Sequence, residues 1–592
     1  MIRLADYVIK FLEKKGITTV FTVSGGGSIF LCDALYKSKK IKYVSHHHEQ
    51  AASFAAESYA RAKKNVGCCF VTTGPGGTNT ITGVTSAWID SVPVIFISGQ
   101  VFLNQTIKQT KKRQIGVQEI NIIDLVKPIT KFSKMIIDPD SINFYLEKAY
   151  AISKSGRPGP VFIDIPADIQ NTMINEKKIL KQKFKPKKTI FSIDSKVNKI
   201  VKILKNSKKP LIHLGHGIRL SNSEKLVKKF FNKYKIPFVV TWNADDIISH
   251  DHKMYCGRPG AFGERGSNFI VQNCDFYLSI GTRLPFMVTG YNTQKFASRS
   301  KFKAMVDIDL NELKKNDLKI DLKIQSDAKF FLQKLFKKLK KYNSNRKWLD
   351  YCSEIRKKYP ILIDKMVNEK KYVNSYFFIK TLSKLTKKHY SIVTDMGFSF
   401  TTSHQAFKIK DNQNFYTNSG HAPMGWGLPA AIGAYYAKKK NPNIICLSGE
   451  GGFQMNIQEL ATIMHNKIPL KIFIFNNGGY LTIKQTQILG FKGRIMGADK
   501  NSGLSFPNYS EIARAHDINY KKIKNHNNLS KQISKILKSK NSVICELIMN
   551  PDEEQIPKAI NRRNLSGKSI PTEFEDMYPF LPRDELNSNY LD

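Results

Sequence analysis

Short apolar runs alternate with helical patterns along most of the chain, and this alternation constrains the fold more than any other feature. Runs such as 66–74, 159–166, 210–215 and 443–449 are mostly apolar and end at Gly or Pro. Between them lie stretches with apolar residues at helical spacing, for example 48–62. Strands separated by helices pair in parallel and are covered by those helices. The alternation therefore predicts an α/β protein built from mostly parallel sheets.

A chain of 592 residues is too long for one such sheet and its helices. We expect an N-terminal domain over residues 1–175, a central domain over 190–335 and a C-terminal domain over 365–550. A Lys-rich stretch, 175–188, would link the first two domains. Residues 551–592 contain several Pro and acidic residues and would form a tail without clear periodicity. The predicted architecture is thus three domains, each a mostly parallel sheet covered by helices.

The formal net charge of +46 invites a nucleic-acid role. The lysines are spread along the chain, however, as in 181–188 and 334–342, and no DNA- or RNA-binding motif accompanies them. We therefore expect no nucleic-acid partner, and the positive field favours anionic small substrates instead. No apolar run reaches the roughly 20 residues that cross a bilayer, and the N-terminus lacks signal-peptide features. With eight cysteines and no CxxC pair, we predict a cytoplasmic protein with reduced thiols and no membrane contact.

The strongest chemical motif lies in the C-terminal segment. Gly449, Glu450, Gly451 and Gly452 follow one apolar strand, and 24 residues separate Gly451 from the pair Asn476-Asn477, which follows another. Glycines after a strand let the backbone approach a phosphate, and the next helix offers free N–H groups. A carboxylate and an amide oxygen are hard ligands that suit Mg²⁺ or Ca²⁺ on a diphosphate. The motif therefore predicts a metal–diphosphate site.

This pattern resembles the signature of the thiamine diphosphate enzymes, GDG followed about two dozen residues later by NN. The resemblance implies that Glu450, the side chain of Asn477 and the carbonyl of Gly479 hold Mg²⁺. It also implies that the loop Gly397-Phe398-Ser399 lies near the diphosphate. Because Glu450 stands where Asp is usual, we expect an altered or weaker metal site. The three predicted domains would then be pyrimidine-binding, central nucleotide-binding-like and diphosphate-binding.

Glu49 supplies a second catalytic signal, because it opens a helix just before the sequence TTGPGGTN (72–79). Taken alone, an acid in the first turn of a helix is a dipole partner. In the family, a Glu at this place hydrogen-bonds the aminopyrimidine ring of the cofactor and promotes the proton transfer that activates it. The family takes this Glu and the diphosphate motif from two subunits, so the resemblance implies a homodimer or homotetramer.

The stretch SGHAPMGWGLPAAIGA (419–434) matches the family segment that lines the two cofactor rings. By this resemblance Met424 would be the apolar support that bends the cofactor, and the carbonyl of Ala422 would accept from the pyrimidine amine. Ile483 would be the apolar neighbour of the reactive carbon. Ordinary core packing is the alternative for Met424, and its neighbours favour the cofactor role.

Among these enzymes the chain is most similar to the acetolactate (acetohydroxyacid) synthase group, through GRPGPVFIDIPADIQ (156–170) and AWIDSVPVIFISGQV (87–101). That group binds FAD in its central domain, whereas related decarboxylases keep the domain without flavin. Glycine-rich turns after strands suit a dinucleotide pyrophosphate, and an acid suits its ribose. The FAD contacts that the resemblance implies are Arg157, Gly215, Gly217, Thr241, Gly260, Ala261, Gly281, Arg283, Asp307 and Asp327.

The acceptor region departs from the group. Gln118 resembles the active-site Gln of the synthases, but the Trp that restricts their acceptor falls on Thr486. The implied activity is decarboxylation of pyruvate, a 2-ketoacid, and transfer of its two-carbon unit to a second pyruvate, giving 2-acetolactate for branched-chain amino acid biosynthesis. Three alternatives stay open: a larger ketone acceptor such as a nucleotide-linked 4-keto sugar, a 2-ketoacid decarboxylase or lyase, and a catalytically silent homologue. A small regulatory subunit is also left open, as is a role for the tail in closing over the active site.

Overall fold

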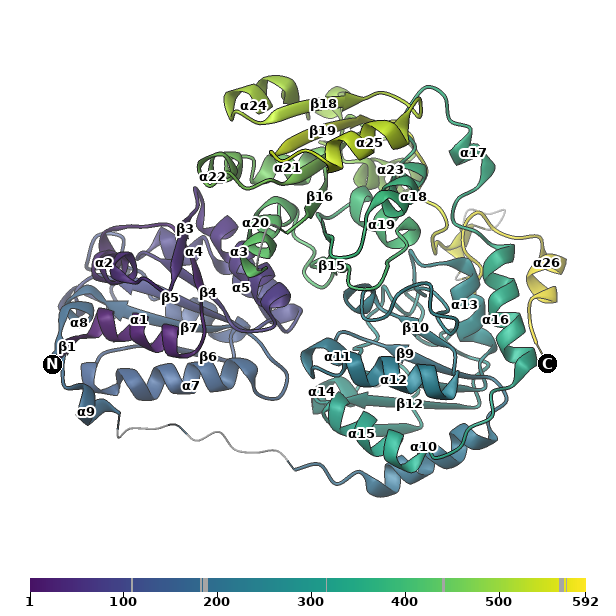
Figure 1. The fold of residues 1–592 in the computed structure, drawn as a ribbon, viewed down its shortest axis with the longest axis horizontal. Helices are drawn as coiled ribbons and strands as arrows, with labels where there is room; N and C mark the ends of the chain where they lie inside the picture. The colour runs from purple at the N-terminus through teal and green to yellow at the C-terminus, as the bar shows by residue number, and fades with distance from the viewer. Residues whose placement is uncertain are drawn as a thin grey trace.

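The computed structural model describes residues 1–107, 110–180, 184, 190–315, 317–438, 442–563, 569–570 and 572–591. Three parallel sheets, each covered by helices, form three domains that Figure 1 shows at the left, the lower right and the top. The predicted three-domain α/β architecture is therefore confirmed. Part of the predicted linker 175–188 lies outside the described residues.

The first domain contains a six-stranded parallel sheet in the order β3-β2-β4-β5-β7-β6. Its inner strands are fully buried, because helices cover both faces. Strands β1 (Ile2–Arg3) and β8 (Met173–Ile174) form a small antiparallel pair beside it. The strands of the large sheet are β2 (Thr19–Thr22), β3 (Lys42–Ser45), β4 (Gly67–Val71), β5 (Val94–Gln100), β6 (Phe132–Met135) and β7 (Val161–Pro166). The helices are α1 (Leu4–Lys14), α2 (Ile29–Lys37), α3 (Glu49–Lys63), α4 (Pro75–Thr78), α5 (Ile81–Ile89), α6 (Ile122–Val126), α7 (Ile142–Lys154), α8 (Ala167–Asn171) and α9 (Glu176–Ile179).

The central domain has a five-stranded parallel sheet in the order β10-β9-β11-β12-β13. In such a sheet the loops after β9 and β11 diverge to opposite faces and leave a crevice at the carboxyl edge. The strands are β9 (Pro210–Leu214), β10 (Phe238–Val240), β11 (Phe276–Ile280), β12 (Phe302–Asp307) and β13 (Leu322–Gln325). The helices are α10 (Asp194–Asn206), α11 (Gly217–Leu220), α12 (Glu224–Tyr234), α13 (Arg265–Asn273), α14 (Leu310–Leu313) and α15 (Ala328–Lys338), followed by the connecting helices α16 (Arg346–Lys358) and α17 (Asp364–Val367).

The third domain repeats the topology of the first, with the order β15-β14-β16-β17-β19-β18. Its switch point lies between β14 and β16, where the loops that carry the predicted diphosphate motif begin. The strands are β14 (Ser391–Thr394), β15 (Asn414–Tyr416), β16 (Ile444–Gly449), β17 (Lys471–Asn476), β18 (Asn519–Ile523) and β19 (Val543–Ile548). The helices are α18 (Ser375–Leu385), α19 (Phe398–Ala406), α20 (Gly427–Ala437), α21 (Glu450–Met455), α22 (Glu459–His465), α23 (Leu481–Gly490), α24 (Tyr509–Ala515) and α25 (Leu529–Leu537).

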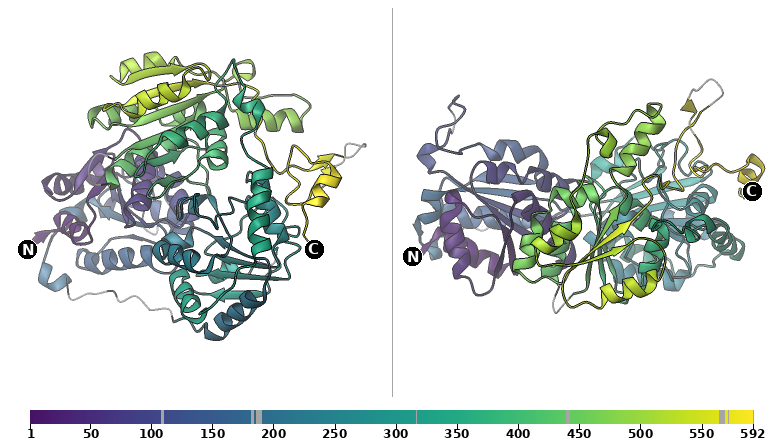
Figure 2. Two further views of the ribbon diagram at one scale, coloured as in Figure 1. Left: turned by 45° about the vertical axis from the view of Figure 1, so that its right-hand side comes forward. Right: turned by 90° about the horizontal axis from the view of Figure 1, so that it is seen from above.

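Most of the tail packs on the central domain. It passes α23 and α19 first, where the backbone carbonyls of Glu553 and Pro557 accept from Gln485 and Gln405. Beyond that it lies beside α13 and α16, as Figures 1 and 2 show at the right-hand side. There the Phe574 ring is buried in the core of the central domain. The tail elements are β20 (Arg562–Arg563), β21 (Ser569–Ile570) and α26 (Arg583–Ser588).

A buried ionic group joins the domains where α3 packs on α20. Arg61 donates to Glu57 at 2.8 Å and to Asp90 at 2.7 Å, and all three side chains are buried. Glu57 also accepts from the indole N–H of Trp426 on the third domain at 3.1 Å. Asp90 accepts from Asn243 of the central domain at 3.2 Å. The group therefore ties the first domain to both of the others.

Replacing Arg61 with Met tests this junction. Two buried carboxylates would lose their cation, so the free energy of unfolding should fall by about 3–5 kcal/mol in urea titrations at neutral pH. Burial already raises the pKa of Glu57, against the effect of Arg61. A raised carboxyl pKa in the folded state means that stability returns as the pH falls through it, so the deficit of the variant should shrink on acidification.

The matched control is Lys15→Met, which removes a partly exposed pair with Glu147. It should cost less than about 1 kcal/mol. Equal losses in the two variants would contradict the assigned importance of the Arg61 junction.

Candidate active site

The predicted metal-binding residues come together at the carboxyl edge of the third sheet. Glu450 follows β16 and is 3% exposed, and its Oε2 atom accepts from the N–H groups of Gly478 at 2.8 Å and Gly479 at 3.2 Å. Burial raises the pKa of Glu450 to about 7, although these hydrogen bonds lower it. Glu450 has a longer side chain than the Asp that is usual at this position, and it reaches Gly478 and Gly479 after β17.

The two asparagines after β17 have different surroundings. The side chain of Asn476 donates to Glu546 at 2.5 Å, so it is used within the fold. The Oδ1 atom of Asn477 is buried and has no hydrogen-bond partner. Within the described residues no three His, Cys, Asp or Glu side chains are grouped to hold a metal ion. A cation here would therefore need the amide oxygen of Asn477 and backbone oxygens such as that of Gly479, together with Glu450.

Glycines around this edge leave open space. A Cβ atom added at Gly397, Gly449 or Gly478 would meet nothing within 4 Å. Ser399 is the second residue of α19, two positions after Gly397, and its hydroxyl oxygen is buried without a hydrogen-bond partner among the described residues. Buried polar atoms normally have partners, so the free atoms of Ser399 and Asn477 point to a bound polar group. Open glycines, a free hydroxyl and the N-terminus of a helix fit a diphosphate.

Gly451 and Gly452 have a packing role instead. A Cβ at Gly451 would lie 2.7 Å from Cε of Met424, and one at Gly452 would lie 2.6 Å from the carboxyl carbon of Asp395. These two glycines let α21 approach the loop that carries Met424. The motif therefore combines glycines that face the open space with glycines that permit close packing.

Asp395, at the end of β14, organises this edge and was not identified from the sequence. Its carboxylate accepts from the backbone N–H groups of Met396 at 2.7 Å and of Gly425 and Gly427 at 3.1 Å each. The residue directly after Met424 and the residue three positions after it are therefore both anchored to Asp395. Ala422, two residues earlier, has a positive φ of 57°, which turns the chain before Met424. An acid directly after a buried strand was the available signal for Asp395.

Glu49 begins α3 in the first domain, where His48 caps the helix by accepting from the N–H of Gln50 at 3.1 Å. Asn79 donates to the Glu49 carboxylate at 2.9 Å, so this side chain has a fixed orientation. Within the described part of the chain, the side chain of Glu49 contacts only its own domain. These contacts do not bring it to the Glu450 edge of the same chain.

The residues predicted to lie near the reactive carbon and the acceptor substrate are at the surface. Gln118 is exposed with a positive φ of 64°, and its backbone carbonyl packs so tightly on Gly74 that a side chain there would overlap it. Ile483 is 47% exposed on α23, and the hydroxyl of Thr486 bonds only its own helix, at Thr482. No bulky side chain stands at position 486, so this part of the surface is open.

A cavity of about 520 Å³ lies at the carboxyl edge of the central sheet, at its switch point. Asp90 and Ser91 of the first domain and Ser419 and Gly420 of the third also line it, so all three domains contribute. Of the residues predicted to contact FAD, those that line the cavity are Arg157, Gly217, Thr241, Gly281, Arg283, Asp307 and Asp327.

Three of the predicted flavin contacts lie elsewhere. A Cβ at Gly215 would overlap the backbone of Gly281, so this glycine serves the close approach of two loops. Gly260 has a φ of 139°, and Ala261 is fully buried and donates its N–H to Met287. Gly215, Gly260 and Ala261 shape the loops behind the cavity wall and are not among its lining residues.

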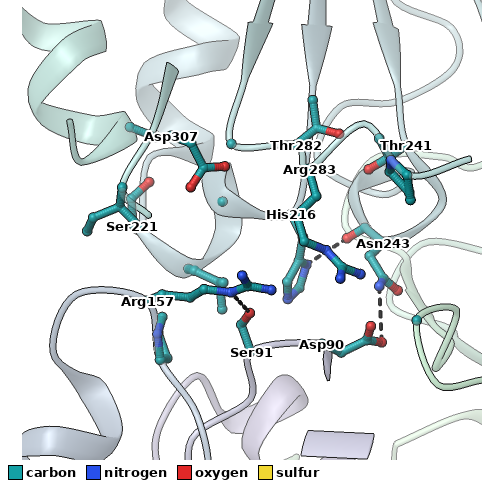
Figure 3. Close-up of a pocket in the computed structure, with 18 of the residues that line it drawn as sticks. Asp90, Ser91, Arg157, His216, Ser221, Thr241, Asn243, Thr282, Arg283 and Asp307 are labelled. Carbon is teal, nitrogen blue, oxygen red and sulfur yellow. Dashed lines mark hydrogen bonds between the residues drawn. The ribbon is translucent and has the colours of Figure 1, made fainter. Parts of the chain in front are cut away.

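Hydrogen bonds and ion pairs fix the orientation of polar side chains in the cavity (Figure 3). Arg157 donates to Ser91 at 2.8 Å and pairs with Asp309 at 3.0 Å, which directs its guanidinium along the cavity wall. His216 contacts the carbonyl of Asn243 at 2.9 Å, and burial lowers its pKa to about 3, so the ring is neutral. Burial raises the pKa of Asp307 to about 6.

His216 and Asn243 were not predicted from the sequence, although His216 stands inside the segment LGHGIR (214–219).

Trp242 connects the cavity to the Glu450 edge. It lines the cavity, and its ring lies 4.7 Å from Phe400 of α19. Trp242, Phe400 and Met396 form a small apolar cluster, against which Met424 packs. The two candidate ligand sites therefore share one wall.

No helix among the described residues is long and apolar enough to cross a membrane.

Comparison with protein-family models gives three matches, each described as a domain of a thiamine pyrophosphate enzyme. The N-terminal TPP binding domain matches residues 2–122, the central domain 197–335 and the C-terminal TPP binding domain 395–547.

Similar proteins cover nearly the whole chain. The acetolactate synthase large subunit of Cyanidium caldarium is 32% identical over 93% of this chain and 94% of its own. The probable acetolactate synthase large subunit of Methanocaldococcus jannaschii is 32% identical over 93% of this chain and 92% of its own. The acetolactate synthase large subunit of Lactococcus lactis subsp. lactis is 30% identical over 93% of each chain. The matched domains and these near full-length relatives show that this chain belongs to the thiamine pyrophosphate enzyme family.

Proposed function

We propose that this protein is a carbon–carbon bond-forming transferase that decarboxylates pyruvate and transfers the two-carbon unit to a second pyruvate, giving 2-acetolactate. The observation that carries the proposal is the edge where Glu450, the free oxygen of Asn477 and open glycines meet. Relatives named acetolactate synthase large subunits support this choice of reaction. Their names also suggest a small partner subunit for this chain.

Thiamine diphosphate, when bound, supplies a nucleophilic carbon and an electron sink that let a 2-ketoacid lose CO₂. In the proposal Glu450, Asn477 and the carbonyl of Gly479 hold Mg²⁺ on the diphosphate, since these are hard oxygen ligands. Gly397 and Ser399 offer a backbone approach and a hydroxyl to the same group. Phe398 begins α19, whose free N–H groups at its N-terminus would bind the diphosphate.

The remaining residues position the reacting atoms. Met424, anchored through Asp395, is the apolar support, and the carbonyl of Ala422 accepts from the pyrimidine amine. Glu49, held by Asn79, exchanges a proton with the pyrimidine ring. Because its contacts stay within the first domain, we propose that Glu49 acts on cofactor held by a second copy of the chain in a homodimer or homotetramer. Gln118 would then contact the acceptor.

We also propose FAD as the ligand of the central cavity. Its size, its cationic Arg157 and Arg283, and the acids Asp307 and Asp327 suit a dinucleotide with a pyrophosphate and ribose hydroxyls. The flavin would bind across all three domains and stabilise their arrangement.

A larger ketone acceptor is the second candidate. The observation that favours it is the open surface around Thr486 and Ile483. A pocket without a bulky side chain there discriminates less against a large acceptor than one that holds an indole.

The direct test is to incubate the purified full chain with pyruvate, thiamine diphosphate, Mg²⁺ and FAD, and to identify the products by NMR. We expect 2-acetolactate, with one CO₂ released for two pyruvates consumed. Release of CO₂ without acetolactate would overturn pyruvate as acceptor and favour the larger ketone. An absence of pyruvate consumption would contradict the proposed donor.

Glu49→Gln should keep thiamine diphosphate bound but lower turnover by about 10²–10⁴-fold, because a positioned proton-transfer group is removed. Calorimetry of cofactor binding and steady-state rates separate the two effects. Glu147→Gln, on α7 of the same domain, is the control and should change neither quantity. Wild-type turnover in Glu49→Gln would refute the assigned role.

Glu450→Asp should tighten the divalent metal site by roughly tenfold, the size of effects that groups around metal ligands have. The Glu450 carboxylate is engaged by the Gly478 and Gly479 amides, and a shorter side chain would leave its oxygens to the cation. Mn²⁺ titration followed by electron paramagnetic resonance measures this affinity without turnover. Glu450→Gln, which removes the charge, should weaken binding, and unchanged affinity in both variants would contradict the metal assignment.

A further inference from the structure

A second cavity of about 260 Å³ lies on the central domain, and its lining includes both Cys256 and Cys352. Pro237, which precedes β10, also lines it, whereas Thr241 at the other end of β10 lines the large cavity. The small cavity is therefore at the opposite edge of the central sheet from the proposed flavin site. None of the residues assigned to catalysis or cofactor binding contributes to it.

The two cysteines are brought together by the segment after β10 and by α16. The N–H of Cys256 donates to Phe238 in β10 at 2.7 Å, which fixes this segment against the sheet. Cys352 lies in the middle of α16, and one turn later Arg356 donates to the carbonyl of Tyr255 at 2.7 Å. Arg356 thus joins the residue beside Cys256 to the helix of Cys352. Both cysteines belong to the same buried core cluster and line the same small cavity.

Basic side chains surround this pair, although the acid Glu264 pairs with one of them, Arg356, at 3.5 Å. Lys253 and Lys357 are exposed at the cavity, and Arg356 lines it with a buried Nε atom that has no hydrogen-bond partner. The neighbouring Cys352 thiol and the charge of Arg356 lower the pKa of Cys256, although burial raises it. Burial raises the pKa of Cys68, Cys274, Cys446 and Cys545 instead.

We propose that Cys256 and Cys352 form a reversible redox site that is oxidised to a disulfide by hydrogen peroxide entering the cavity. The Cys256 thiolate attacks one peroxide oxygen, the O–O bond breaks, and a sulfenic acid and water form. The Cys352 sulfur then attacks the sulfur of Cys256 and a second water leaves, so two thiols and one peroxide give one disulfide and two waters. An external dithiol reverses the reaction by exchange.

The disulfide would fasten α16 to the edge of the central sheet. Two α16 residues also hold the tail, since Tyr351 donates to the backbone of Asn589 at 2.7 Å and Lys358 to its side chain at 2.8 Å. Oxidation would therefore stiffen the segment on which the tail is anchored. The inference does not depend on the proposed carboligase activity.

The test treats the purified full chain, with its cofactors, with hydrogen peroxide, blocks remaining thiols with N-ethylmaleimide, and digests it without reductant. Mass spectrometry should find the Cys256 and Cys352 peptides linked, two hydrogens lighter than the reduced pair, and dithiothreitol should restore both. Oxidation of Cys274 to the same extent, or no linked peptide, would overturn the proposal.

Variants make the test specific. Cys352→Ser should abolish the link and let Cys256 go on to sulfinic acid, while Cys274→Ser, another buried central-domain thiol, should keep the link. Arg356→Met should slow formation of the disulfide by about threefold to tenfold, because the neighbouring charge favours the thiolate. An unchanged rate in Arg356→Met, with the link intact, would refute the electrostatic part of the proposal. If Cys352→Ser does not fold, the presence or absence of the linked peptide in the unaltered chain still tests the proposed disulfide.

Discussion

The buried pairing of Arg61 with Glu57 and Asp90 is the interaction on which the arrangement of the three domains depends. Each acid also accepts from another domain, Glu57 from Trp426 and Asp90 from Asn243. A buried charge that loses its partner is costly, so the domains cannot separate here without a large penalty. The large cavity has Asp90 and Asn243 in its wall, and it exists in this form only while that junction holds.

One topological rule then explains where both candidate ligand sites lie. In the third sheet the loops after the neighbouring strands β14 and β16 carry Gly397 and Glu450, and in the central sheet the loops after β9 and β11 carry Gly217 and Gly281. Parallel sheets place ligands at the carboxyl edge where such neighbouring loops diverge. The first and third sheets share one strand order although the sequence shows no short internal repeat. Shared backbone topology therefore does not require a shared residue pattern.

The sequence predicted inner strands such as β4, β7, β9 and β16, because buried parallel strands are continuous apolar runs. It missed edge strands such as β3 and β18, where Lys and other polar residues hide the pattern. Asp395 was not predicted because it acts by accepting from N–H groups that lie about thirty residues later in the chain. Gly215 was predicted to contact a flavin because a glycine that packs against backbone and a glycine that contacts a ligand look the same in the sequence.

The cavity and the Glu450 edge are mechanically connected through α19. This helix starts beside Gly397, at the proposed diphosphate site, and its Phe400 packs on Trp242 of the cavity wall. Near its other end the buried His404 lies 3.4 Å from Asp245 of the central domain, which Arg258 also pairs with. Near its start α19 therefore contacts the cavity wall, and near its end it is held to the central domain through Asp245. A flavin that takes no part in the chemistry would still have a role, because it would hold α19 and Met424 in the positions that the other site requires.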